Sequence, residues 1–235
     1  MSNKKDLEIS MKIKGVIFDM DGTLVDSLMF WGYFWKKIGT SYLGDPDFVP
    51  DEEVDKKVRT MILTDAMHLI RETYGIGDGY EALLSFAADG LQDFYRNTAK
   101  VKPGAIALLD DLRARGFRLC LASATASREV RIALDSCGLT DYFDEILSCA
   151  DIGAGKDKPD IYFAAADALS AKPEELAVVE DSFTALETAK AAGFHTVGVF
   201  DRYNFEQNRL RAASEIYIDE TMSLDALIPM LEAAR

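Results

Sequence analysis

Short apolar runs that end at polar residues alternate along this chain with segments of helical periodicity. The first run, Lys14–Phe18, stops directly at the turn sequence Asp19-Met20-Asp21-Gly22-Thr23, which is typical of a fully buried strand. Strands that alternate with helices predict an α/β fold with a doubly wound, parallel, Rossmann-like sheet. The later apolar runs lie at residues 117–122, 145–147, 176–179, 196–200 and, more weakly, 216–218.

The helical segments between these runs carry start and stop signals. Residues 104–115 place Ile106, Leu109 and Leu112 on one predicted face. Residues 182–192 begin with a capping-type serine and stop at Gly193, a residue favoured just beyond a helix. These signals support the helix assignments of an alternating α/β core.

One long segment interrupts the alternation. Residues 28–98 contain no convincing strand, and their apolar residues recur at helical spacing over 28–38, 54–74 and 80–95. We therefore predict an all-helical cap inserted after the first strand. The predicted division is a core formed by residues 11–27 and 99–235, a cap formed by residues 28–98, and a flexible N-terminal tail, residues 1–10.

The charge of the chain limits its partners. Forty acidic residues against 26 basic ones give a net charge of -14, which would repel nucleic acid and anionic membranes. The same charge would repel a phosphorylated substrate, so a phosphate site would need a local cation. No apolar stretch approaches the length of a membrane-spanning helix, and the N-terminus lacks the apolar core of a signal peptide. We expect a cytoplasmic protein without an obligate protein partner.

Four polar clusters follow the predicted strands, and the carboxyl ends of parallel strands share one edge of a sheet. The first cluster holds Asp19 and Asp21, two residues apart. Asp19 could act as a nucleophile that forms an aspartyl-phosphate, and Asp21 could act as general acid and then general base. An ordinary Asp-Gly turn after a strand is the alternative explanation.

The second and third clusters could bind phosphate. Ser123 ends the second core strand, and its hydroxyl and neighbouring backbone N–H groups, such as that of Ala124, could bind a phosphoryl oxygen. A serine that caps the next helix is the more common arrangement. Lys156 and Lys158 precede the next helix and could offset the charge shared by nucleophile and phosphate, although loop lysines are usually solvated.

The fourth cluster could hold a metal ion. Glu180 and Asp181 end an apolar strand, where adjacent acids are costly unless something pairs with them. Magnesium prefers a few carboxylates together with phosphate oxygens and water, and a surface turn is the alternative. Taken together, the four clusters contain the parts required for in-line phosphoryl transfer.

At these positions the chain resembles the haloacid dehalogenase superfamily, in its phosphatase and phosphomutase branch with a helical cap. The resemblance covers about residues 14–201, with the first motif at Asp19–Thr23, the second at Ser123 and the fourth at Glu180-Asp181-Ser182. It implies that Asp19 is the nucleophile and Asp21 the acid/base. It further implies magnesium held by the Asp19 carboxylate, the Asp21 backbone carbonyl and Asp181, with Glu180 in support.

The third motif is less regular. The family often reads Gly-Lys-Pro-x-Pro-Asp, whereas this chain reads Gly155-Lys156-Asp157-Lys158-Pro159-Asp160. Counting back four residues from the aspartate selects Lys156 as the catalytic lysine. Lys158 remains the alternative because it directly precedes a proline, as the family lysine usually does.

The resemblance favours a magnesium-dependent phosphatase that acts on a small phosphorylated metabolite. The dehalogenases lack the second aspartate, so Asp21 favours phosphate-ester chemistry. A β-phosphoglucomutase-like sugar phosphomutase is the main alternative, and a catalytically silent binding module is a third. The mutases show a histidine soon after the first motif, where this chain has Trp31, and their cap loop with an Arg or Lys-Gly-Val segment is not found here.

The cap sequence suggests further roles. Trp31 and Trp35 lie four residues apart, as do Phe30 and Phe34. We expect these aromatic residues to pack within the cap, and a place along the substrate cleft is the alternative. His195 precedes a strand and shows no catalytic partner in the sequence, so we expect it to be structural. Candidate specificity residues of the cap are Lys36, Lys37, Arg59, His68 and Arg71.

Overall fold

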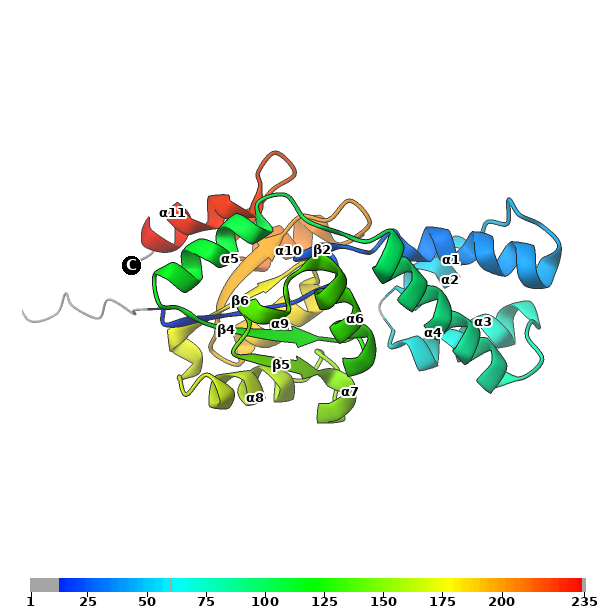
Figure 1. The fold of residues 1–235 in the computed structure, drawn as a ribbon, viewed down its shortest axis with the longest axis horizontal. Helices are drawn as coiled ribbons and strands as arrows, with labels where there is room; N and C mark the ends of the chain where they lie inside the picture. Colours follow the sequence, from blue (N-terminus) through cyan, green and yellow to red (C-terminus); the bar gives the residue numbers. More distant parts are fainter. Residues whose placement is uncertain (1–12, 60, 234–235) are drawn as a thin grey trace, which may run out of the picture.

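A six-stranded parallel sheet forms the centre of the molecule (Figure 1). The computed structural model describes residues 13–59 and 61–233, so the predicted N-terminal tail lies outside the described residues. The strand order is β5-β4-β1-β6-β7-β8. The predicted α/β fold class is confirmed. The strands are β1 (Gly15–Phe18), β4 (Arg118–Ser123), β5 (Glu145–Ser148), β6 (Leu176–Glu180), β7 (His195–Val199) and β8 (Ile216–Ile218).

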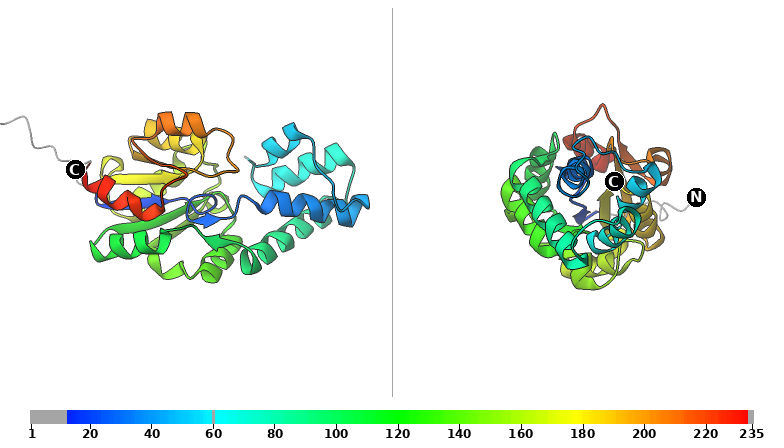
Figure 2. Two further views of the ribbon diagram at one scale, coloured as in Figure 1. Left: turned by 90° about the horizontal axis from the view of Figure 1, so that it is seen from above. Right: turned by 90° about the vertical axis from the view of Figure 1, so that its right-hand side faces the viewer.

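Helices cover both faces of the sheet, as Figures 1 and 2 show. Successive strand residues point to opposite faces, so Val16 and Phe18 belong to one apolar cluster and Ile17 to the other. The first cluster includes residues of α5 (Ala105–Ala114), α6 (Ser127–Cys137) and α11 (Leu227–Ala233). The second includes residues of α8 (Asp160–Ala168), α9 (Phe183–Ala191) and α10 (Gln207–Ala213). The short helix α7 (Cys149–Ile152) directly follows β5.

The predicted inner face of α5 was wrong at one residue. Ile106 is 45% exposed, whereas Leu109 and Leu112 are buried as expected. The buried stripe of this helix begins at Ala105 and recurs at Leu108, Leu109 and Leu112. Because successive residues of a helix are about 100° apart around its axis, Ile106 lies at the solvent-facing edge of this stripe.

Four helices form the cap, which lies beyond the carboxyl edge of the sheet (Figure 1). They are α1 (Phe30–Ile38), α2 (Glu52–Val58), α3 (Leu63–Tyr74) and α4 (Tyr80–Asn97), with a π-helical turn (Gly39–Leu43) after α1. The single helix predicted over 54–74 is therefore two helices. The first begins earlier than predicted because the Asp51 carboxylate accepts hydrogen bonds from the backbone N–H groups of Glu53 and Val54.

The chain enters and leaves the cap through a small antiparallel sheet that was not predicted from the sequence. It consists of β2 (Val25–Asp26) and β3 (Lys100–Val101), paired at Val25↔Val101 and Asp26↔Lys100. Each strand is two residues long, which is too short to give a periodic signal. The assignment of residues 28–98 as a separate domain stays a prediction.

Aromatic side chains fill the interior of the cap. Phe30, Trp31, Phe34 and Trp35 are all buried, and the rings of Phe30 and Phe34 stack with centroids 5.3 Å apart. The indole N–H of Trp35 donates to Asp55 of α2 over 2.6 Å. These side chains therefore pack within the cap. No helix among the residues that the structure describes is both long and apolar enough to cross a membrane.

Leu109→Ala should reduce the free energy of unfolding by about 2–5 kcal/mol, because it leaves a cavity in the first apolar cluster, to which Leu109 belongs. Ile106→Ala on the same helix is the matched control and should change that free energy by less than about 0.5 kcal/mol. Urea unfolding followed by circular dichroism measures both. Equal losses in the two variants would contradict the observed orientation of α5.

Candidate active site

Three adjacent strands deliver polar side chains to the same edge of the sheet. Asp19 directly follows β1, Ser123 is the last residue of β4, and Glu180 is the last residue of β6. Strand β1 lies between β4 and β6, and the chain changes direction across the sheet at β1. Ligands of open parallel sheets bind outside the carboxyl ends of strands at such a reversal. The three side chains are all buried, at 6%, 0% and 1% exposure.

Lys156 lies between two of these carboxylates. Its Nζ donates to Asp19 Oδ1 over 2.5 Å and also to Glu180 Oε1. Burial alone would lower the pKa of this amine, but the charges of Asp19 and Glu180 outweigh burial and hold the pKa well above its ordinary value. Lys158, the alternative third-motif lysine, is exposed. The structure therefore brings Lys156, and not Lys158, to the carboxylates.

Asp19, Glu180 and Asp181 form a buried acidic cluster, in which one carboxylate oxygen of each lies within 4.8 Å of the others. Burial, followed by the charge of Asp19, raises the pKa of Asp181 well above its ordinary value. Burial also raises the pKa of Glu180, to about 7, because Lys156 offsets only part of the cost of ionisation. Three buried carboxylates around one ammonium leave negative charge uncompensated, so the donor set fits a hard divalent cation.

Asp21 is surrounded by hydroxyl groups from three parts of the chain. Its Oδ1 accepts hydrogen bonds from Ser27 Oγ at 2.6 Å and from the Tyr95 hydroxyl at 2.7 Å. Its Oδ2 accepts one from Thr125 Oγ1 at 2.8 Å. Burial and then the charge of Asp19 raise the pKa of Asp21, while the three hydrogen bonds oppose that rise.

The loops around the cluster approach one another closely. Ser123 Oγ accepts a hydrogen bond from the Thr125 backbone N–H at 3.0 Å, which shapes the turn that carries the exposed Ala124. Gly22 has a φ of +81°, and a Cβ there would lie 2.5 Å from Asp181 Oδ2. The glycine of the first motif is therefore required both by the backbone conformation and by the carboxylate beside it.

Several residues that contact the site were not predicted from sequence. Ser27 and Thr125 lie close to motif residues, and a search for hydroxyls near Asp21 and Ser123 could have suggested them. Tyr95 and Asn204 gave no such signal, because only the folded chain brings them to the site. Asn204 Nδ2 donates to the backbone oxygen of Asp181 and, over 3.3 Å, to its Oδ2.

Other sequence candidates lie elsewhere or have other partners. His195 begins β7, at the edge of the sheet opposite the site, where its Nδ1 lies 2.7 Å from Glu215 Oε2. His68 is exposed and stacks on Tyr80 with ring centroids 3.7 Å apart. Arg59 donates to Asp55 and to the Leu28 carbonyl, near the start of the cap. Lys36 and Arg71 are exposed, and the Lys37 ammonium lies over the Phe86 ring.

The family model for haloacid dehalogenase-like hydrolases matches residues 13–193, which span the whole acidic cluster. The chain belongs to the haloacid dehalogenase-like hydrolases. The predicted superfamily and hydrolase class are confirmed.

Curated relatives of this family are similar over most of their length. The phosphorylated carbohydrates phosphatase of Thermotoga maritima is 26% identical over 93% of this chain and 100% of its own. The phosphoglycolate phosphatase of Rhodospirillum rubrum is 31% identical over 88% of this chain and 87% of its own. The β-phosphoglucomutase of Bacillus subtilis is 27% identical over 80% of this chain and 83% of its own.

Solved structures agree on the fold. CbbY from Rhodobacter sphaeroides, determined in complex with phosphate, superposes with a TM-score of 0.76. The superposition covers 92% of this chain and 96% of that one at 22% identity, so it supports the fold alone.

Magnesium should raise the melting temperature more at about pH 8 than at about pH 5.5, because protons compete with the cation for the carboxylates. Because the pKa of Glu180 is raised in the folded state, the folded protein holds the carboxyl proton of Glu180 more tightly than the unfolded chain does. Without metal, the protonated Glu180 therefore contributes to the stability of the fold. This contribution is complete below about pH 4.5 and is lost as the pH rises towards about 7. Differential scanning fluorimetry with and without magnesium measures the effect.

Asp181→Asn is the control for this measurement, because the amide removes one charge and one cation donor from the cluster. The magnesium-dependent shift should shrink in this variant at both pH values. A shift of equal size at the two pH values in the unmodified chain would argue against a carboxylate cation site.

Proposed function

We propose that the protein is a magnesium-dependent phosphatase that hydrolyses a small phosphate ester through an aspartyl-phosphate on Asp19. The observation that carries this proposal is the contact of Asp19 with Lys156 inside the buried acidic cluster. The Lys156 ammonium donates to the Asp19 carboxylate over 2.5 Å, and a carboxylate is the form of this side chain that can attack phosphorus. The same ammonium offsets part of the negative charge that would repel a phosphate dianion from this acidic protein.

In the first proposed step, an oxygen of Asp19 attacks the phosphorus atom while the bond from phosphorus to the ester oxygen breaks. The carboxyl group of Asp21 donates its proton to the departing oxygen, which leaves as an alcohol. The raised pKa of Asp21 supports this role, because it increases the share of carboxyl groups that hold a proton to donate.

In the second proposed step, the Asp21 carboxylate takes a proton from water as the water oxygen attacks phosphorus. The bond between phosphorus and Asp19 breaks, which restores the Asp19 carboxylate and releases inorganic phosphate. Ser123 and the backbone N–H of Ala124 are proposed to bind phosphoryl oxygens, and Lys156 to offset charge throughout.

Magnesium would be held by the Asp19 and Asp181 carboxylates and the Asp21 backbone carbonyl, with Glu180 in support. When bound, this cation would neutralise charge between the nucleophile and the incoming phosphate. The close approach of Asp19, Glu180 and Asp181 supports the assignment, because carboxylates are the oxygen ligands that magnesium prefers.

A phosphomutase is the second candidate, since one similar relative carries that name. A mutase must hold a second phosphate in its cap while the intermediate turns round. At the position where the mutases have a histidine, this chain has Trp31, which is 8% exposed and packs against Phe30 and Phe34. An indole buried in this way cannot bind phosphate, which favours the phosphatase.

The substrate is proposed to be a small phosphorylated metabolite. Relatives named for phosphorylated carbohydrates and for phosphoglycolate support this size class. The cap lies over the carboxyl edge of the sheet, which supports a substrate small enough to be enclosed between cap and core (Figure 2).

Asp19→Asn should lower phosphate release by at least about a thousandfold, because the amide keeps the shape of the side chain but is a poor nucleophile. The assay is phosphate release from a panel of sugar phosphates, phosphoglycolate and nucleotides, with magnesium and with chelator. Release that needs magnesium supports the phosphatase. Isomerisation of a sugar phosphate that depends on a bisphosphate activator and releases no net phosphate would instead support the mutase over the phosphatase.

Lys156→Met should lower kcat/KM by about a hundredfold or more, because it removes the cation beside Asp19. Lys158→Met is the matched control. Its kcat/KM should stay within about twofold of that of the unmodified protein, since the Lys158 side chain is exposed. Steady-state kinetics on the preferred ester would compare the two. Loss of activity in Lys158→Met alone would reverse the assignment of the third motif.

A further inference from the structure

One of the three hydroxyls that hold Asp21 belongs to the cap. Ser27 lies just after β2, and Thr125 lies in the loop after β4. Tyr95 lies in the last turns of α4, 74 residues along the chain from Asp21, yet its hydroxyl is 2.7 Å from Asp21 Oδ1. The proposed acid/base therefore has partners in both the core and the cap.

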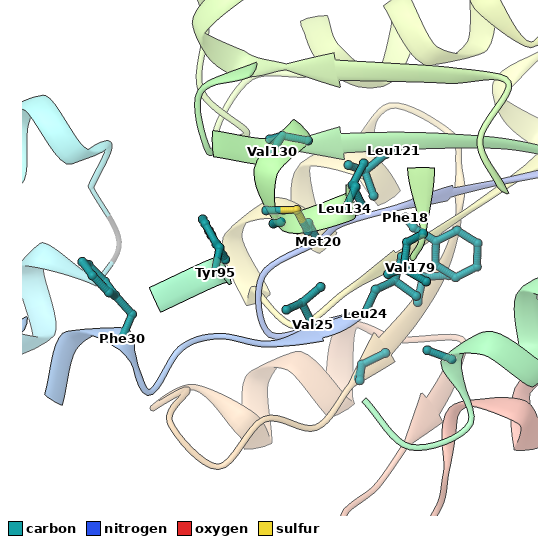
Figure 3. Packing of buried hydrophobic residues seen from close by; sticks show 14 of the residues in the cluster. Phe18, Met20, Leu24, Val25, Phe30, Tyr95, Leu121, Val130, Leu134 and Val179 are labelled. Carbon is teal, nitrogen blue, oxygen red and sulfur yellow. The ribbon is translucent and has the colours of Figure 1, made fainter. Parts of the chain in front are cut away.

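The position of Tyr95 is fixed by the packing of α4 against the core. Its side chain is 2% exposed and lies between Phe30 of the cap and Met20 of the loop after β1 (Figure 3). Three residues earlier on α4, the Gln92 amide donates to Glu129 of α6 over 2.9 Å, and both of these side chains are buried. Residues three apart lie on the same face of a helix, so Gln92 and Tyr95 both contact the core from one face of α4.

Hydroxyl partners suit a carboxyl group that must gain and lose a proton. A hydroxyl can donate to a carboxylate and can rotate to accept from a carboxylic acid, which an ammonium or a guanidinium cannot do. Burial and the charge of Asp21 raise the pKa of Tyr95 well above its ordinary value, so its hydroxyl stays neutral. The Tyr95 contact can therefore persist through both proposed steps.

We propose that Tyr95 is a positioning residue through which the docked cap orients the Asp21 carboxyl group for proton transfer to the leaving oxygen. This inference rests on the proposed phosphatase mechanism. When α4 moves away from the core, Tyr95 leaves with it, and Ser27 and Thr125 then remain as the hydroxyl partners of Asp21 among the described residues. Proton transfer is then efficient only while the cap covers the substrate.

The dependence of the rate on the leaving group tests this role. The probes are aryl phosphates of similar shape, from p-nitrophenyl phosphate, whose leaving group needs no proton, to phenyl phosphate, whose leaving group does. The value of kcat/KM covers the steps up to departure of the alcohol, so it reports the proton transfer by Asp21.

Tyr95→Phe should lower kcat/KM by about tenfold for phenyl phosphate and by less than about twofold for p-nitrophenyl phosphate. Asp21→Asn, which cannot donate the proton, should show a still steeper dependence on the leaving group. Tyr33→Phe is the matched control, because Tyr33 also donates to an aspartate, Asp93, over 3.1 Å, but at the exposed surface of the cap. Its dependence on the leaving group should match that of the unmodified protein.

Equal losses on all aryl esters in Tyr95→Phe would overturn the inference and leave Tyr95 as a packing residue. If this variant is too unstable to assay, Gln92→Met loosens α4 while keeping Tyr95, and it should steepen the leaving-group dependence. An unchanged dependence in a folded Gln92→Met variant would equally overturn the inference. Failure of the unmodified protein to release phosphate from any ester would instead remove the proposed phosphatase.

Discussion

Mutual repulsion among Asp19, Glu180 and Asp181 is the constraint around which the carboxyl edge of the sheet is organised. Parallel pairing places β1 and β6 side by side, so acids at their ends necessarily lie close together. Lys156 compensates part of this charge through its contacts with Asp19 and Glu180. Ionising adjacent buried acids works against folding, and this is a cost that functional sites often carry.

The loop after β7 connects this acidic cluster to the cap. Asp201 pairs with Lys102, which follows the return strand β3, and their atoms lie 2.8 Å apart. Asn204 contacts Asp181, and the ring of Phe205 lies 5.9 Å from the guanidinium of Arg59 on the cap. A change at the acidic cluster therefore has a short physical path to the cap through a single loop. The contact of Tyr95 with Asp21 provides a second path that does not use this loop.

The sequence predicted the features that depend on local pattern. Buried strands of a parallel sheet are continuous apolar runs, so the six core strands were visible, and the acids at their ends were visible with them. The break between α2 and α3 was missed because apolar spacing continues across it, and Ile106 was misplaced because periodicity fixes a stripe only to within one residue. The strands β2 and β3 are too short for any periodic signal.

The partners of the predicted site residues were harder to predict for a different reason. Asp21 and Asp181 were recognised from their motifs, but Tyr95 and Asn204 reach them from distant segments, and a tyrosine near the end of an amphipathic helix resembles any other core residue. The choice between Lys156 and Lys158 depended on which side chain folds inwards, and two lysines in one loop look alike in a sequence. Tertiary contacts distinguished these cases.

The antiparallel pair β2 and β3 also bears on how such a protein can diversify. Because the chain leaves and re-enters the core at neighbouring residues, the two ends of the inserted segment lie side by side. Closing a longer or shorter insertion between fixed neighbouring ends changes the chain entropy only slightly, since this cost grows slowly with loop length. Lids of different size and lining could therefore be exchanged over an unaltered sheet, so that the range of substrates evolves separately from the chemistry at the strand ends.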